Sequence, residues 1–131
     1  NHLILIKHAM PHINTSKSSR DWELSPEERQ SCIPLAEALK PYSLQQMITS
    51  DEPKARDTGQ ITANHLNIPC TIAPNLHEHD CQGAPFLSDK TEFHTIIKTL
   101  FDQPNDFIFG NETASQACER FTPSNRPRAH K

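Results

Sequence analysis

The chain has 131 residues and a formal net charge of −3, so it has the length of one domain and carries no excess of positive charge. Nucleic-acid-binding domains hold phosphates through clustered Lys and Arg, so this balance argues against a nucleic-acid partner. No apolar run approaches the roughly 18 residues of a membrane span, and no basic segment precedes the first apolar run as in a secretory signal. We therefore expect a single cytoplasmic domain over residues 1–131 with no membrane partner.

The four cysteines are scattered and form no Cys-x-x-Cys pair. Such spacing is typical of reduced thiols and favours neither a disulfide framework nor a zinc site.

The chain opens on a short apolar run that ends in a basic pair. Residues 3–6 are Leu or Ile, and Lys7, His8 and Ala9 follow. This length favours a buried strand over a helix, with the basic pair at its carboxyl end. Ligands of open α/β sheets bind at that edge, so His8 is a candidate nucleophile or base in an anion site. The plainer interpretation is a histidine that caps a strand end, with Lys7 in solvent.

The first helix is predicted to begin at Ser25. Ser25-Pro26-Glu27-Glu28 combines an N-cap, a proline at the first helical position and a capping-box Glu. The helix should end before Pro41 and bury a stripe formed by Cys32, Leu35, Ala36 and Leu39.

A short strand around Met47-Ile48 should lead into a second helix. This helix is predicted to begin within residues 50–53 and to run to about Leu66, before Asn67. A helix N-terminus offers free N–H groups and a positive dipole end to an anion, and Lys54 lies in the first turn. The alternative is an ordinary capped helix with exposed charges.

A third strand, at residues 70–73, and two further helices, at residues 88–101 and 110–121, are predicted next. The stripe expected to be buried in the former helix consists of Phe93, Ile96, Ile97, Leu100 and Phe101. Residues 122–131 are rich in Pro, Arg and Asn and are expected to form an irregular tail. Strands that alternate with helices indicate an α/β fold with a parallel sheet, whose edge would bring residues 7–8 and 50–56 together.

A polar cluster, His77-Glu78-His79-Asp80, follows the third strand. A bound anion would raise the pKa of a neighbouring carboxyl, which suits a general acid. The cluster could instead hold a metal ion, although alternate residues of one extended loop seldom converge on a single ion. It could also be a solvated acidic loop.

Taken in order, these segments resemble the histidine phosphatase superfamily, also called phosphoglycerate mutase-like, over about residues 3–120. The family's Arg-His-Gly corresponds to Lys7-His8-Ala9, and its Leu-Thr-Pro-Glu-Gly helix start is similar to residues 24–28. Its Ser-Ser-Pro-Leu-x-Arg-Ala motif is similar to residues 49–55. The remaining matches are Asn14, Leu76-His77-Glu78 with Gly83, and Gly110-Asn111-Glu112-Thr113 with Arg120.

The resemblance implies a three-layer sandwich with a mostly parallel central sheet flanked by helices. It also implies hydrolysis of phosphomonoesters through a phosphohistidine, without a metal or another cofactor. His8 would be the nucleophile and Glu78 the proton donor, whereas Lys7, Asn14 and Lys54 would contact the phosphate, together with Arg56 as a further cation. The expected partners are a small phosphorylated substrate or a phosphoprotein, and the phosphate ion. The short chain favours a phosphatase over a mutase.

Three departures from the family pattern bear on activity. Lysines stand in place of two arginines and lose the bidentate fork, and Ala9 adds a Cβ where the family has glycine. The family's late strand ends in a second pocket histidine, but here His130 follows Arg120 by ten positions without an apolar strand before it. We therefore expect a truncated or degenerate member, with His130 as the candidate second histidine. The alternative function is a non-catalytic relative that binds phosphate or a phosphoprotein.

Overall fold

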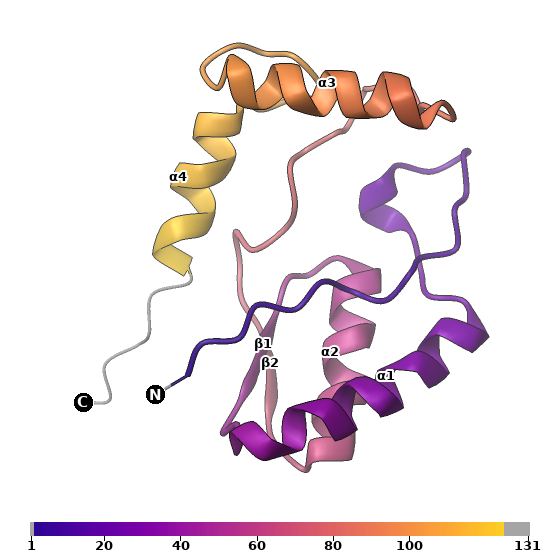
Figure 1. The fold of residues 1–131 in the computed structure, drawn as a ribbon, viewed down its shortest axis with the longest axis vertical. Coiled ribbons are helices and arrows are strands. Elements are labelled where there is room, and N and C mark those ends of the chain that lie inside the picture. The colour runs from indigo at the N-terminus through magenta and orange to yellow at the C-terminus, as the bar shows by residue number, and fades with distance from the viewer. Residues whose placement is uncertain (1, 125–131) are drawn as a thin grey trace.

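Two short parallel strands and the helix that joins them form the centre of the molecule (Figure 1). The computed structural model describes residues 2–124, so His130 and the rest of the tail beyond Ser124 lie outside the described residues. Strand β1 (Met47–Thr49) pairs in parallel with β2 (Cys70–Ile72), with Met47 opposite Cys70 and Thr49 opposite Ile72. The predicted α/β class, with parallel strands and flanking helices, is confirmed.

Helix α2 (Pro53–Leu66) connects the two strands and packs directly against them. Its close approach depends on Gly59, because a Cβ there would lie 2.1 Å from Thr49 Cγ2. The helix ends at Asn67, whose φ of 55° is left-handed, a conformation that Asn tolerates better than most residues. The predicted end of this helix is therefore confirmed.

Helix α1 (Pro26–Leu39) packs against α2. The Ser25 hydroxyl accepts a hydrogen bond from the Glu28 N–H at 3.2 Å, which confirms the predicted N-cap. Three residues of the predicted stripe are buried, namely Cys32, Ala36 and Leu39. Two 3-10 turns flank the helix, η1 (Ser19–Asp21) before it and η2 (Lys40–Tyr42) after it.

The predicted first strand is not formed. Residues 2–10 contain no strand, and the side chains of Leu3 and Leu5 are 65% and 71% exposed. Within residues 2–124 the parallel sheet consists of β1 and β2, and the apolar run pairs with neither strand. Apolar character alone does not specify a strand, because a strand also needs a neighbour that satisfies its backbone groups.

Helices α3 (Lys90–Asp102) and α4 (Ala114–Ser124) lie away from the sheet, at the opposite end from α1 (Figure 1). In α3 Leu100 is buried, but Phe93 and Phe101 are 42% and 72% exposed, so the predicted stripe is only partly correct. Helix α4 begins after Thr113 and extends to Ser124, into the predicted tail. No helix within residues 2–124 is long and apolar enough to cross a membrane.

Candidate functional site

His8 lies on the N-terminal segment and precedes Ala9, which binds to α2. Its Nδ1 is 2.7 Å from the Ala9 carbonyl oxygen. A carbonyl oxygen only accepts, so Nδ1 must carry a hydrogen, and in the neutral ring Nε2 then has a free lone pair. The Ala9 N–H donates to Thr58 Oγ1 at 3.0 Å, one helical turn beyond Lys54. This bond places His8 near the start of α2 without any strand pairing.

Lys54 is buried in the first turn of α2, with a side chain only 2% exposed. Its ammonium forms an ion pair with the Glu78 carboxylate and lies 5.9 Å from the centre of the Trp22 ring. A buried charge is stable only when it is paired, and an indole face adds a weaker attraction for a cation. The ammonium is therefore a fixed positive charge at the beginning of this helix.

Glu78 faces both the imidazole ring of His8 and the ammonium of Lys54. Its Oε1 accepts from Lys54, and its Oε2 is 3.8 Å from His8 Nε2. The imidazole of His8 and the ammonium of Lys54 hold the pKa of this carboxyl at about 2, although partial burial acts in the opposite direction. Glu78 is therefore a carboxylate at neutral pH, whereas the sequence-based expectation was a pKa raised by a neighbouring phosphate.

The backbone of Glu78 is held from two sides. Its N–H donates to Glu52 Oε2 at 3.3 Å, and its carbonyl accepts from Arg120 Nη2 at 3.2 Å. Glu52, the N-cap residue of α2, is itself only 5% exposed. Sequence reasoning missed Glu52, although its position before a proline at a helix start was a signal for a capping role.

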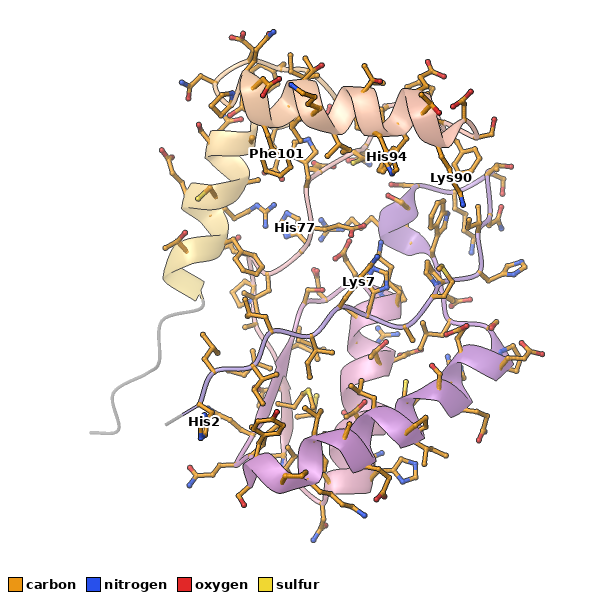
Figure 2. The ribbon with its side chains drawn as sticks, in the orientation of Figure 1. His2, Lys7, His77, Lys90, His94 and Phe101 are labelled. Atoms are coloured by element: carbon orange, nitrogen blue, oxygen red, sulfur yellow. The ribbon has the colours of Figure 1, made fainter. Side chains whose placement is uncertain are left out.

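The surroundings of the other predicted phosphate contacts within residues 2–124 differ from one residue to the next. Lys7 is exposed on the N-terminal segment (Figure 2). The side-chain oxygen of Asn14 accepts from the N–H and the hydroxyl of Ser16, as in a local turn. The Asn14 carbonyl accepts from Trp22 Nε1 at 2.9 Å, so Asn14 reaches Lys54 through the indole. Arg56 is exposed, and its Nε lies 3.3 Å from Asp57 Oδ1.

The side chains of the His77–Asp80 cluster point to different partners. Glu78 pairs with Lys54, a ring nitrogen of His79 lies 2.6 Å from the Phe109 carbonyl, and Asp80 Oδ1 accepts from the Gln82 N–H. Within residues 2–124, no group of three or more His, Cys, Asp or Glu side chains could hold a metal ion. The metal-site interpretation of this cluster is therefore not supported.

His8, Lys54 and Glu78 together form a set with a defined chemistry. An imidazole nitrogen with a free lone pair, a buried ammonium and a carboxylate meet at the N-terminus of a helix that follows a parallel strand. Such a position attracts anions, and the imidazole can act there as a nucleophile or a base. The fold and this site define an α/β protein with a candidate anion-binding site that contains a histidine.

The family comparison agrees with this class. The family model of the histidine phosphatase superfamily (branch 1) matches residues 3–125, so the chain belongs to that superfamily. A comparison with curated protein sequences gives no match.

Solved structures of mycobacterial proteins share the fold. The native structure of mycobacterial glucosyl-3-phosphoglycerate phosphatase superposes with a TM-score of 0.70 at 18% identity, over 88% of this chain and 57% of that chain. Its complex with inorganic phosphate gives a TM-score of 0.63 at 18% identity, over 88% and 56% of the two chains. Mycobacterial hydrolase 2 gives 0.67 at 19% identity, over 88% and 52%. The present chain thus spans little more than half the length of these similar structures.

Proposed function

We propose that this protein hydrolyses phosphomonoesters through a phosphohistidine at His8. The observation that carries the proposal is the hydrogen bond from Nδ1 to the Ala9 carbonyl, because it leaves the lone pair of Nε2 on the side of Glu78 and Lys54. Nε2 attacks phosphorus, and the bond from phosphorus to the ester oxygen breaks. The Lys54 ammonium neutralises the phosphoryl oxygens, and Glu78 gives a proton to the departing oxygen. Water then attacks the phosphohistidine and releases phosphate.

The ion pair between Lys54 and Glu78 must open for this reaction. The imidazole and the ammonium that now face Glu78 are the groups that would meet a bound phosphate. A bound phosphate displaces the carboxylate and, as a like charge beside it, raises its pKa, so that Glu78 can carry the proton that it donates. Lys7, Asn14 and His130 are proposed as further phosphate contacts, supported by the family motif for the first two.

The test is trapping of the phosphorylated protein. Incubation with a radiolabelled aryl phosphate, followed by alkaline quenching, should leave acid-labile label on the wild type and none on His8→Ala. His94→Ala, an exposed histidine of α3, is the matched control and should label like the wild type. Equal labelling of His8→Ala and the wild type would contradict the assignment of the nucleophile.

The second candidate is a non-catalytic module that binds phosphate or a phosphoprotein. It is favoured by the lysine at the buried cationic position, because an ammonium lacks the planar fork with which arginine binds two phosphoryl oxygens. Phosphate binding that requires Lys54, together with no label on His8 and no turnover, would decide for this candidate.

A further inference from the structure

We propose that Arg120 and Glu112 are positioning residues that hold the loop of residues 75–81 so that the Glu78 carboxyl stays directed at the leaving group. The inference rests on the proposed function, since it concerns the proton donor of that reaction. Both residues bind the backbone of this loop, so the loop is the route by which they can act on Glu78.

Arg120 donates to three carbonyls of the loop. Its Nη1 is 3.0 Å from the Asn75 oxygen and 2.7 Å from the His77 oxygen, and its Nη2 is 3.2 Å from the Glu78 oxygen. A guanidinium carries five N–H donors in a rigid fork, so it can bind several carbonyls at once, which an ammonium cannot do with the same geometry. Arg120 therefore fixes the backbone on both sides of His77.

Glu112 fixes the guanidinium and the end of the loop. Its Oε1 is 2.6 Å from Arg120 Nη2, and its Oε2 is 3.2 Å from Arg120 Nε. The same Oε1 accepts from the Asp80 N–H at 2.8 Å. The side chains of Arg120 and Glu112 are only 15% and 13% exposed, so this bidentate pair is well shielded from water.

The chain before α4 also touches the loop closely. The Asn111 N–H donates to the Asp80 carbonyl at 2.9 Å. Gly110 has a φ of 83°, and a Cβ there would lie 2.0 Å from the Asp80 oxygen. Only a glycine permits this contact, because a side chain would be strained in the backbone and would also collide with the loop.

The backbone of Glu78 is thus hydrogen-bonded to two different parts of the molecule. Its N–H bonds to Glu52 at the start of α2, and its carbonyl bonds to Arg120 on α4. The loop crosses from the sheet toward α3, and α4 lies beside it (Figure 1). Loosening the Arg120 side should leave the anion site of His8 and Lys54 in place and disturb mainly the proton transfer.

The test compares substrates that differ in their need for a proton donor. Phenyl phosphate releases a basic phenolate, whereas 2,4-dinitrophenyl phosphate releases an anion that leaves without protonation. In Arg120→Lys and Glu112→Gln, kcat/KM for phenyl phosphate should fall on the order of 10²-fold, the cost of a misplaced catalytic group. For the dinitrophenyl ester the loss should be about threefold or less, since no proton is needed.

Arg29→Lys is the matched control, because Arg29 pairs with Asp57 on α2, outside the loop. Arg29→Lys should have the same kcat/KM as the wild type for both substrates. Glu78→Gln should likewise lose more kcat/KM for phenyl phosphate than for the dinitrophenyl ester. Adding Arg120→Lys to Glu78→Gln should cause no further loss. Both results would support the action of Arg120 through Glu78. Equal losses for both esters, or no loss for either, would overturn the proposal.

A second measurement does not depend on turnover. Carbon-13 NMR of the carboxyl groups should find the Glu78 pKa near 2 in the wild type and closer to that of an ordinary Glu in Arg120→Lys and Gly110→Ala. An unchanged titration would overturn the proposal even in an inactive protein. If the Glu78 pKa shifts in these variants but the wild type has no turnover, the proposed function is wrong and the positioning role still stands.

Discussion

The two members of the Lys54–Glu78 ion pair differ in their exposure to solvent, and this difference constrains the chemistry of the site. The lysine side chain is 2% exposed, whereas that of the glutamate is 49% exposed. The carboxylate can therefore swing into solvent, but the ammonium cannot follow it. An unpaired buried charge is costly, so movement of Glu78 favours the entry of another anion beside Lys54. This exchange is the physical basis of the proposed phosphate site.

The acid stability of the protein should depend on Glu78. Its pKa is lowered to about 2 in the folded protein from an ordinary value of 4.5, so the unfolded state binds the proton more tightly. The stabilising contribution is therefore present above pH 4.5 and is lost as the pH falls toward 2. Urea unfolding of the wild type and Glu78→Gln between these pH values should show a smaller loss of stability in the variant.

Glu27→Gln is the control for this measurement, because it removes an exposed carboxylate in the first turn of α1. It should follow the acid dependence of the wild type. A Glu78→Gln variant that loses stability as steeply as the wild type would show that the ion pair does not stabilise the fold.

At the scale of elements, the local signals in the sequence predicted helices well and strands less well. Ser25 caps α1, and Asn67 ends α2, each as expected from a few neighbouring residues. Residues 3–6 were predicted as a strand from their apolar character, but a strand needs a partner from elsewhere in the chain. The close contact of α2 with β1 at Gly59 also carried no sequence signal, because a helical glycine does not reveal what lies against it.

Replacement of Gly59 by alanine should destabilise the fold. Alanine favours helices over glycine by about 1 kcal/mol, but the added methyl group would lie 2.1 Å from Thr49 Cγ2. Relief of this overlap must shift α2 or β1, at a cost of about 1–3 kcal/mol, so the expected net change is a loss of up to about 2 kcal/mol. Urea unfolding of Gly59→Ala measures it. Gln60→Ala, at the neighbouring exposed position, should change stability by less than about 0.5 kcal/mol, and a stabilised Gly59→Ala would refute the contact.

At the scale of the whole molecule, the site joins segments that are distant in the sequence. His8 comes from the N-terminal segment, Lys54 from α2, and Glu78 from a loop that Arg120 of α4 holds. A ligand at this junction contacts several of these segments only when the chain is folded. Its binding should therefore stabilise the whole fold by linkage.

Inorganic phosphate should raise the melting temperature through Lys54. At a phosphate concentration of about 100 times Kd, linkage predicts a stabilisation of about 2.7 kcal/mol. Differential scanning calorimetry at constant ionic strength, with chloride as the reference anion, measures this effect. Lys54→Met should abolish the phosphate-dependent shift, whereas Lys98→Met, which removes an exposed ion pair on α3, should retain it. If phosphate still raises the melting temperature of Lys54→Met, the phosphate binds at a site other than Lys54.

The α/β class, the order of the motifs, the two central helices and the candidate site residues His8, Lys54 and Glu78 could all be predicted from the amino-acid sequence. These features depend on short-range signals, such as caps, helix-breaking residues and motif spacing, that neighbouring residues encode. The folded structure adds that His8, Lys54 and Glu78 meet, and that Glu52 and Arg120 hold Glu78. Those outcomes depend on which distant surfaces cover one another, because burial and the pairing of buried charges are properties of the folded chain.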